Sequence, residues 1–449
     1  MASSGESPDP LHLNSYKGLP LLGSFPEFVR DSPKFLVKLS QSRGPLTEFR
    51  LGPRRVVFVG EPELIEQILF RDALCFRKSL AVRRTDILLG RSLINDDSDA
   101  YLPRRQLMSK AFTRKKLELY CEGMKNCTQT RAKSWQGGTL LNLSSEITTL
   151  TLEILTSSLF SHSNRDDAGN VRVALEHFQK CFPYMLLPGA SLLGRFPLPQ
   201  VLRIRRARSM LDETIYRLID ERLSKRSEHR DLLEMLLEAR DETSSREDLT
   251  REQLRNELAT IYLAGHETTA AALCWTIYLL CCNPNFYERL LAEVDQVLGE
   301  GSVTVDNINN LELVRFALSE SLRLFPPIWA FGRENKDEYQ LGSAKFPEGT
   351  TFVVSPFVLG RDPRFFSEPS LYRPSRFENP SWPRCSYLPF GGGVRRCLGD
   401  RFAMQEAIVV LAMLSKFWRF RYENPLPATY RAAVTLRIDP ELYLRLEAR

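Results

Sequence analysis

The sequence predicts a mainly helical α+β protein with a small β-rich lobe. Two observations lead to this prediction. Apolar residues recur at three- and four-residue spacing along much of the chain, as in amphipathic helices, and strand-like runs are short and fall in two distant places. Two separated strand segments are most economically joined in one sheet. With 449 residues, 43% of them hydrophobic, the chain is long enough to bury an internal site.

The first strand-like segment, residues 47–60, reads TEFRLGPRRVVFVG and predicts a hairpin around GPRR. The second lies at residues 349–360, within a stretch from 325 to 390 that is rich in proline and glycine. This stretch predicts an ordered, winding loop region.

Helical periodicity is clearest in three segments, residues 231–241, 252–265 and 310–324. Pro326 and Pro327 end the third helix near Arg323, because proline cannot donate the next hydrogen bond of a helix. We find no internal repeats and no low-complexity linker.

Composition restricts the class of protein. Nine cysteines form no CxxC pair and show no zinc-site spacing, which favours a reducing compartment over a secreted disulfide scaffold. The N-terminus lacks the pattern of a signal peptide. Residues 258–282 are the only candidate for a membrane span, and His266 and Glu267 near their middle would be costly in lipid. We therefore expect a cytoplasmic protein without a transmembrane anchor.

One cysteine near the C-terminus lies in unusual surroundings. Residues 390–399 read FGGGVRRCLG, so that Cys397 follows three glycines and two arginines. Most cysteines in such a chain are small buried hydrophobes. Here, however, the arginines favour the thiolate, the form that binds metals, and so does the helix start that the following residues predict. The pattern predicts a ligand for a soft transition metal or a haem iron.

The spacing of Phe390, Gly393, Arg395, Cys397 and Gly399 resembles the haem-binding signature of the cytochromes P-450, the haem-thiolate monooxygenases. At average residue frequencies, five fixed residues match by chance in about one of ten thousand such chains. The resemblance spans about residues 17–445 and is to soluble bacterial-type members. It implies haem b (iron protoporphyrin IX) between a distal and a proximal helix, with Cys397 as axial ligand.

The same resemblance implies one cytochrome P-450 domain over residues 1–449, with the β-rich lobe at about 20–75 and 325–380. The residues Glu320 and Arg323 resemble the family's ExxR helix, and Arg376 lies in a segment that matches its PxRF motif. Read alone, a Glu–Arg pair at this spacing is usually a weak surface pair. By resemblance, the three residues form a buried structural network and are not catalytic.

Residues 264–269, AGHETT, resemble the distal helix of the family. Read alone, they suggest a helix crossing with small residues, which leaves the acid Glu267 in an apolar segment unexplained. By resemblance, Ala264 and Gly265 lie over the haem and Gly265 gives clearance for dioxygen, while Glu267 and Thr268 form the acid–alcohol pair that guides protons to the bound oxygen. We expect His266 to be structural.

Three arginines match the family's propionate-binding positions, namely Arg105, Arg333 and Arg395. Tyr101 stands where the family usually has tryptophan, and its phenol can still donate a hydrogen bond. Guanidinium groups around two carboxylates form chemically suitable pairs.

The implied function is hydroxylation or epoxidation of a lipophilic small molecule such as a terpenoid, a steroid-like compound or a fatty acid. Dioxygen is the co-substrate, and electrons come from a separate ferredoxin or flavodoxin with its reductase. Basic residues around 104–116 and 395–401 suggest a docking patch for such an acidic protein. We expect a monomer that binds no nucleic acid.

The substrate class rests on apolar segments that the resemblance places along the pocket, among them 88–89, 181–187, 262–263, 328–331 and 434–436. The alternative function is a haem-thiolate peroxygenase, isomerase or dehydratase that does not use dioxygen. The pair of Glu267 and Thr268 argues against it, because those branches of the family tend to lose the acid and the alcohol.

Overall fold

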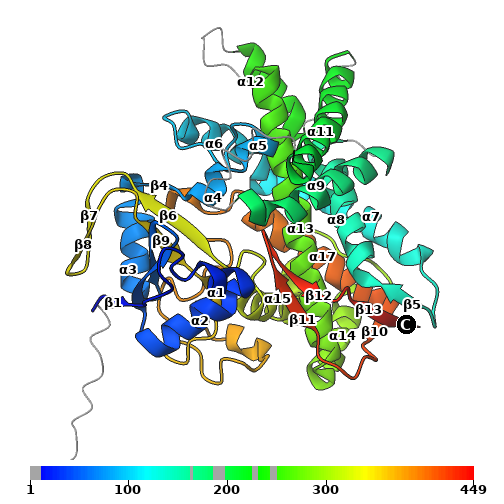
Figure 1. Ribbon diagram of the computed structural model, residues 1–449. Helices are drawn as coiled ribbons and strands as arrows, with labels where there is room; N and C mark the ends of the chain where they lie inside the picture. The colour runs from blue at the N-terminus through cyan, green and yellow to red at the C-terminus, as the bar shows by residue number, and fades with distance from the viewer. Residues whose placement is uncertain (1–11, 162–164, 186–197, 225–230, 243–249) are drawn as a thin grey trace, which may run out of the picture. The chain divides into compact units, whose positions relative to one another are not determined.

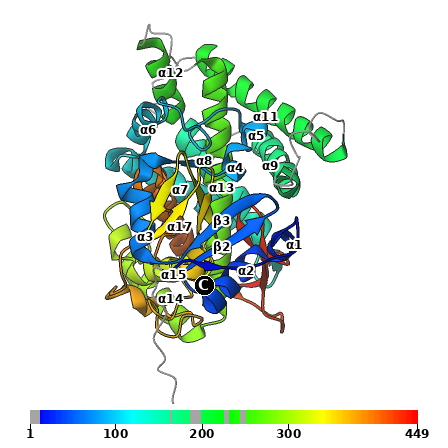
Figure 2. The same cartoon turned by 60° about the vertical axis from the view of Figure 1, so that its left-hand side comes forward.

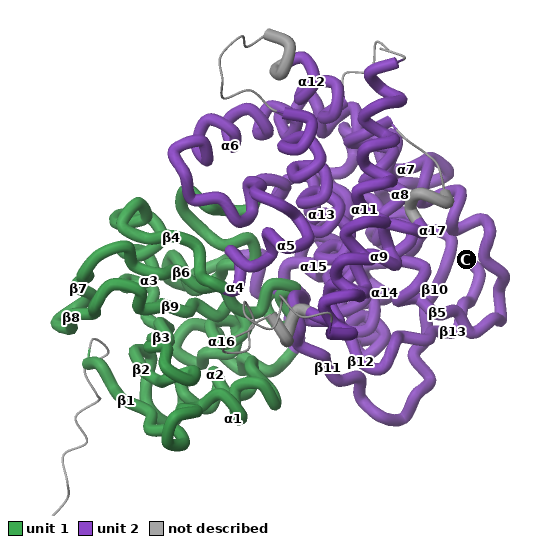
Figure 3. Tube along the Cα trace, turned by 45° about the horizontal axis from the view of Figure 1, so that its top comes forward, with its two compact units in different colours: residues 1–80, 323–371, 380–397 green, residues 81–322, 372–379, 398–449 purple. Residues whose placement is uncertain are grey.

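The structure, a computed structural model, describes residues 12–161, 165–185, 198–224, 231–242 and 250–449. The chain divides into two compact units (Figure 3). The first unit comprises residues 1–80, 323–371 and 380–397, and the second comprises 81–322, 372–379 and 398–449.

The first unit is built on a six-stranded sheet. In spatial order its strands are β1 (Asn14–Ser15), β2 (Leu46–Leu51), β3 (Arg54–Val59), β9 (Thr351–Val354), β6 (Phe331–Asn335) and β4 (Phe76–Lys78). The predicted hairpin is confirmed, because β2 and β3 pair antiparallel around the turn at Gly52 and Pro53 (Figure 2). The predicted union of the distant strand segments is confirmed as well, with Val56 of β3 opposite Thr351 of parallel β9.

Shorter elements surround this sheet in the first unit. They are α1 (Phe25–Arg30), α2 (Ser32–Arg43), α3 (Pro62–Glu66), α16 (Pro356–Leu359) and the hairpin strands β7 (Tyr339–Leu341) and β8 (Ala344–Phe346). The strand predicted at 349–360 is too long, because the Ser355 side chain caps α16 by accepting from the Val358 N–H. The stretch from 325 to 390 also contains β6, β7 and β8, which the prediction of a winding loop missed.

The second unit is mostly helical (Figure 1). Its helices are α5 (Asp86–Leu89), α6 (Tyr101–Ser109), α7 (Arg114–Ser134), α8 (Leu143–Phe160), α9 (Arg165–Met185), α11 (Pro199–Ser224), α12 (Leu232–Glu242), α13 (Arg251–Cys281), α14 (Pro284–Leu298) and α17 (Asp400–Phe417). Helix α15 (Glu312–Leu324) begins in this unit and ends in the first, and α4 (Leu80–Arg83) begins at the other boundary. The three predicted helices are confirmed as α12, α13 and α15.

Two small sheets complete the second unit. One contains β10 (Trp418–Arg421), β13 (Tyr443–Ala448) and β5 (Leu140–Asn142), and the other pairs β11 (Thr429–Ala432) with β12 (Leu436–Asp439). The indole N–H of Trp275 on α13 donates to the carbonyl of Leu436 at 3.1 Å, which fixes β12 beside the helix.

Helix α13 is the central helix of the second unit. A capping box starts it, because the Thr250 hydroxyl accepts from the Gln253 N–H while the Gln253 side chain accepts from the Thr250 N–H. The helix packs against α8, α11, α17 and β12, and most of its side chains are buried. This explains its apolar sequence. Within the described ranges, no helix is both long and apolar enough to cross a membrane.

Candidate active site

One face of α13 carries a small residue and a hydroxyl side by side. Ala264 is exposed and Thr268 is partly exposed, four residues further along the same face. The Thr268 hydroxyl donates to the Ala264 carbonyl at 2.7 Å. This is the back-bond that threonine in a helix is expected to form. The structure therefore presents a hydroxyl group beside an uncovered stretch of the helix.

His266 and Glu267 point to the buried side of the same helix. Nδ1 of His266 lies 2.6 Å from the Tyr262 carbonyl, and burial lowers the pKa of this histidine to about 4, so the ring is neutral. This agrees with a structural role. A Cβ at Gly265 would lie 2.6 Å from Cδ1 of Leu155 on α8, so the Leu155 side chain would have to shift to admit a larger residue here. The role of Gly265 in leaving room for dioxygen stays a prediction.

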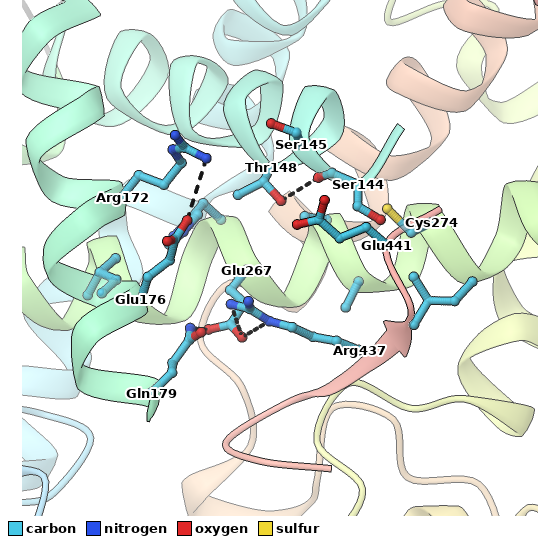
Figure 4. Close-up of a pocket in the computed structure, with 15 residues that line it drawn as sticks. Ser144, Ser145, Thr148, Arg172, Glu176, Gln179, Glu267, Cys274, Arg437 and Glu441 are labelled. Atoms are coloured by element: carbon cyan, nitrogen blue, oxygen red, sulfur yellow. Dashed lines mark hydrogen bonds and ion pairs between the residues drawn. The ribbon is translucent and has the colours of Figure 1, made fainter. Parts of the chain in front are cut away.

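The carboxylate of Glu267 is held by three side chains from outside its helix. Oε1 accepts from Nε of Arg437 at 2.6 Å, and Oε2 accepts from the Gln179 amide (Figure 4). Oε1 also accepts from the Thr435 hydroxyl. Burial raises the pKa of Glu267, and Arg437 and the Thr435 hydroxyl oppose that rise. The acid is therefore turned away from Thr268 in this structure.

A polar cavity of about 120 Å³ lies beside this cluster in the second unit. Glu267 and Arg437 line it together with Ser144 and Thr148 of α8 and Glu176 of α9 (Figure 4). Its lining is suited to water, because hydroxyl, carboxylate and guanidinium groups all face it.

The cysteine loop belongs to the first unit. The Cys397 N–H donates to the Phe390 carbonyl at 2.9 Å, which closes the loop on itself. Gly393 has φ +67°, and a Cβ there would lie 1.7 Å from the Leu69 carbonyl oxygen, so only glycine fits. The Cys397 side chain is exposed, and Gly399 caps α17 two residues later. The predicted position of the cysteine just before a helix is confirmed.

Two predicted propionate ligands lie on this unit. Arg395 donates from Nη1 to the Ala73 carbonyl at 2.9 Å and from Nη2 to the Phe76 carbonyl at 2.8 Å, which ties the cysteine loop to β4. Arg333 lies on β6 directly opposite Lys78 of β4, and both residues are buried. Opposite residues of an antiparallel pair point to the same face, and two cations there repel each other. Such a pair is suited to an anionic ligand.

Tyr101 and Arg105 occupy the same face of α6 in the second unit, four residues apart. Tyr101 is buried and Arg105 is half-buried. Their neighbour Arg104 points to buried acids instead. Its side chain is only 10% exposed and forms ion pairs with Asp96 at 3.2 Å and Glu257 at 3.4 Å. Its predicted membership of a surface docking patch is therefore wrong.

The pairing of Glu320 with Arg376 in the predicted structural network is confirmed, and Arg323 bonds to backbone carbonyls of the first unit. In the second unit, Oε1 of Glu320 accepts from Nε of Arg376 at 3.2 Å and from the Arg373 N–H at 2.8 Å. In the first unit, Arg323 donates to the carbonyls of Pro369 at 2.7 Å and Leu371 at 3.0 Å. Glu320 and Arg323 each bind backbone groups of neighbouring loops, which supports a structural role.

Sequence reasoning missed Lys78 and the three partners of Glu267. Lys78 could have been found from its short strand, CFRKSL, once that strand was paired with β6. Gln179, Thr435 and Arg437 had no local signal, because each lies at least 88 residues away from Glu267 along the chain.

Comparison with known proteins agrees with this arrangement. A family profile described as Cytochrome P450 matches residues 14–441. The chain is 33% identical over 423 residues to cyclooctatin synthase of Streptomyces melanosporofaciens, covering 92% of this chain and 90% of that protein. It is 30% identical over 436 residues to pentalenene oxygenase of Streptomyces avermitilis, covering 96% of each. It is also 30% identical to cyclooctat-9-en-7-ol 5-monooxygenase of S. melanosporofaciens, covering 92% of this chain and 89% of that protein.

A cysteine thiolate placed just before a helix can bind a haem iron, and the family match makes this chain a haem-thiolate oxidoreductase. The chain belongs to the cytochrome P450 family, and it is a monooxygenase whose haem has a cysteine thiolate as axial ligand. The residues present fit this group, because an exposed thiol lies on a loop that only glycine can form and two buried cations share one face of the sheet.

Proposed function

We propose that this protein oxygenates a terpenoid-like substrate, by hydroxylation or epoxidation, using dioxygen and electrons from a separate ferredoxin or flavodoxin. The observation that supports this most is the exposed Cys397 thiol on its glycine-built loop, in a chain related to monooxygenases. When bound, the haem supplies the activation of dioxygen and the transfer of one oxygen atom to the substrate.

The chain's own residues have separate tasks in this proposal. Cys397 is the axial ligand, and its sulfur donates electron density to the iron. Arg105, Arg333 and Arg395 bind the propionates, with Tyr101 as a further hydrogen-bond donor. We add Lys78 to this set, because it lies opposite Arg333 on the same face of the sheet.

Thr268 and Glu267 deliver protons in this proposal. The Thr268 hydroxyl faces the uncovered side of α13 and holds one proton at Oγ1. A group within hydrogen-bond reach of a reacting oxygen can supply a proton as a general acid. Glu267, one residue earlier, replaces the proton that Thr268 gives away.

Relatives of the chain support a terpenoid substrate, since their names refer to cyclooctatin, cyclooctat-9-en-7-ol and pentalenene. Leu88, Leu89, Tyr262 and Leu263 are predicted by the family resemblance to lie along the substrate pocket, and they are buried apolar or aromatic residues of the second unit. The side chains of residues 182–187, another predicted pocket segment, lie outside the described residues. A steroid-like compound or a fatty acid is the competing substrate class.

A basic surface on the second unit suits an acidic redox protein. It is formed by Lys110, Arg114, Lys115 and Lys116 with Arg401 at the start of α17, and we call it the basic patch. The ring of Phe112 packs on Phe402 with ring centroids 6.2 Å apart, which brings these two segments together.

The proposal is tested on the purified holoprotein in two steps. A panel of terpenoids, steroids and fatty acids is first screened for the absorbance change that accompanies displacement of water from the haem. The holoprotein is then incubated with each ligand that binds, either with a surrogate ferredoxin system under air or with peroxide alone. We expect oxygenated terpenoid only with the electron donor under air. Product with peroxide alone would instead favour the peroxygenase alternative.

A further inference from the structure

Residues 90–96, which connect α5 to the start of α6, cross α13 beside its uncovered face, and we call them the crossing segment. The hydroxyl of Thr260 on α13 donates to Oγ of Ser92 at 2.6 Å. Thr260, Ala264 and Thr268 follow one another at four-residue intervals and therefore lie along one face of the helix. The crossing segment thus borders this face one helical turn before Ala264. All these residues belong to the second unit (Figure 3).

The crossing segment presents two apolar side chains at this border. Leu93 and Ile94 directly follow Ser92, and both are half-buried. The next residue, Asn95, points back into the segment, because it donates to the Gly90 carbonyl at 2.8 Å and accepts from the Ser92 N–H at 2.9 Å. The segment therefore satisfies its own polar groups and leaves apolar surface partly accessible.

Helix α13 holds the backbone of the crossing segment through side chains. Both carboxylate oxygens of Glu257 lie 3.0 Å from the Leu93 nitrogen, whose N–H donates to them. Asn256 donates from Nδ2 to the Arg91 carbonyl at 3.3 Å. Gly90 has φ +66°, and a Cβ there would lie 2.2 Å from Oδ1 of Asn256. The segment therefore approaches α13 as closely as only glycine permits.

Glu257 makes the strongest of these contacts. It is completely buried, and hydrogen bonds to a carboxylate are stronger than those between neutral groups. It also forms an ion pair with Arg104 at 3.4 Å. Arg104 has a second partner in Asp96 at 3.2 Å, so removal of Glu257 still leaves this cation paired. The bond that holds Leu93 can therefore be removed without leaving Arg104 unpaired.

Burial of the contacts makes the crossing segment a rigid part of the second unit. Asn95 is 7% exposed, Asp96 is 3% exposed and Glu257 is not exposed at all. Local opening would break several buried polar bonds together, and such segments open rarely. This arrangement is that of a fixed wall and not of a mobile lid.

Resting on the function proposed above, we infer that the crossing segment is a fixed wall of the substrate space and that Glu257 is the positioning residue that holds it. Leu93 and Ile94 limit how far a lipophilic substrate extends along α13 beyond Ala264, toward Thr260. Apolar groups that fit against a wall of fixed position distinguish one substrate from another. The wall therefore selects among terpenoids by length and shape.

Hydrogen exchange of the holoprotein tests whether the wall is fixed. The probe is dodecylimidazole, which has a nitrogen for the haem iron and an apolar tail. We expect the Leu93 amide of the wild type to exchange slowly, and its rate to change by less than about twofold when the probe binds. A slowing of about tenfold on binding would show a mobile lid and overturn the inference.

Variants of Glu257 test its positioning role in the same experiment. Glu257→Ala removes the acceptor and should speed exchange at Leu93 by about tenfold or more, whereas Glu257→Gln keeps an acceptor oxygen and should restore most of the protection. Thr260→Val, which removes the bond to Ser92, is a second variant in case Glu257→Ala folds poorly. Unchanged exchange at Leu93 in these variants would contradict the role of Glu257.

Glu293 of α14 provides a matched control, because its carboxylate also holds backbone. It accepts from the Leu313 N–H at 2.8 Å and from the Val314 N–H at 3.2 Å. We expect Glu293→Ala to speed exchange at Leu313 and to leave Leu93 at the wild-type rate. An equal effect of Glu293→Ala on Leu93 would mean that Glu257→Ala acts only by lowering general stability.

A second readout compares the affinities of dodecylimidazole and imidazole, of which only the first has a tail that reaches the wall. We expect Glu257→Ala to weaken binding of dodecylimidazole by about tenfold and that of imidazole by less than about twofold. Leu93→Ala should act in the same way, and adding Glu257→Ala to it should cause little further loss, because Glu257 acts through Leu93. Additive losses, or equal losses for both probes, would contradict the inference.

Failure of the proposed function is recognised separately. A wild-type protein that oxygenates no terpenoid with the electron donor under air would refute that function. The exchange rates and the probe affinities need neither terpenoid nor turnover, so they decide on the wall in either case.

Discussion

Nε of Arg376 donates a hydrogen bond to Oε1 of Glu320 at 3.2 Å, and both side chains are almost completely buried. A second donor, the Arg373 N–H, reaches the same oxygen at 2.8 Å. The carboxylate of Glu320 therefore links α15 to residues 372–379 through one cation and one backbone group. Removing one partner of a buried pair leaves the other charge without compensation, and this typically costs about 3–5 kcal/mol.

We predict that Glu320→Ala lowers the free energy of unfolding by about this amount and reduces the haem content of the purified protein. Urea unfolding of the holoprotein and the ratio of Soret to protein absorbance measure the two effects. Arg315→Ala on the same helix is the control, because Arg315 forms an exposed pair with Glu312 at 3.5 Å. Exposed pairs contribute about 0–1 kcal/mol. Equal losses in the two variants would contradict a special role for Glu320.

The second prediction concerns the axial ligand. Cys397→His keeps a ligand that can bind haem iron but removes the sulfur. We expect a coloured protein whose reduced, carbon-monoxide-treated form lacks the red-shifted Soret band of thiolate ligation, and whose oxygenation activity is abolished. Cys75→Ser is the control, since Cys75 is another exposed cysteine of the first unit. An unchanged hydroxylation rate in Cys397→His would show that another group binds the iron.

How much of the fold can be predicted from the sequence depends on how far apart along the chain the interacting residues lie. The hairpin of β2 and β3 and the helix after Cys397 were predictable, because their signals are local: strand runs around a turn, and helical periodicity after a glycine. Strand β6 was missed because its sequence, FGREN, is mostly polar although four of its five residues are buried. Pairing with β4 and β9 determines this strand.

In the candidate site, too, local motifs were predictable and contacts between distant residues were not. Cys397, Glu267 and Thr268 stand in compact motifs, whereas the groups that bind Glu267 come from α9 and from the chain near β12. Arg104 was assigned to a surface patch because its sequence neighbours are basic, but the fold places it against Asp96 and Glu257. A single sequence does not tell which residue of a charged run is buried.

A third prediction follows from a buried carboxyl group on α17. Glu406 is fully buried, and within the described part of the chain it forms no ion pair. Burial raises its pKa well above the usual value, with the Thr269 hydroxyl opposing that rise. The folded protein therefore binds this proton more tightly than the unfolded chain does. Stability is lost as pH rises from the unfolded pKa toward the folded one.

We predict that Glu406→Gln, which keeps the shape without the acid, is increasingly stabilised relative to wild type as pH rises from 5 to 8. Unfolding at several pH values measures this difference. Glu122→Gln is a suitable control, because Glu122 is exposed and paired with Lys125 at 2.6 Å, and its pKa is lowered by that lysine. A stability difference that does not change with pH would mean that Glu406 is ionised in the folded protein.

The basic patch leads to the fourth prediction. Lys115 and Arg401 are exposed, whereas Lys110 and Lys116 line a pocket with Asp231, Glu234 and Glu238. Among the residues of the basic patch, charge reversal at Lys115 and Arg401 should therefore weaken the binding of an acidic redox protein most. We expect Lys115→Glu/Arg401→Glu to slow association by at least tenfold at low salt, with a difference that shrinks as salt rises. Lys345→Glu on β8 of the first unit is the control. An equally large fall in the association rate in Lys345→Glu would contradict a docking surface at the basic patch.

The last prediction tests the two adjacent threonines of α13 against each other. Thr268 is partly exposed and bonds to the Ala264 carbonyl at 2.7 Å, whereas Thr269 is buried and bonds to the Gly265 carbonyl at 3.2 Å. Both hydroxyls make the same kind of bond four residues back, so their removal affects the helix in similar ways. Only Thr268 lies on the face that carries Ala264, and only it can offer a proton there.

We therefore expect Thr268→Ala to consume reductant while product formation falls by about a hundredfold, the lower end of the range for general acid catalysis. Thr269→Ala should keep its ratio of product to reductant, and Thr268→Ser should restore most of the loss because it keeps Oγ. Product, peroxide and reductant are measured together in each variant. If Thr268→Ala converted reductant to product as efficiently as Thr269→Ala does, the proton would have to reach the substrate oxygen without Thr268, and Glu267 would need another route from its cavity.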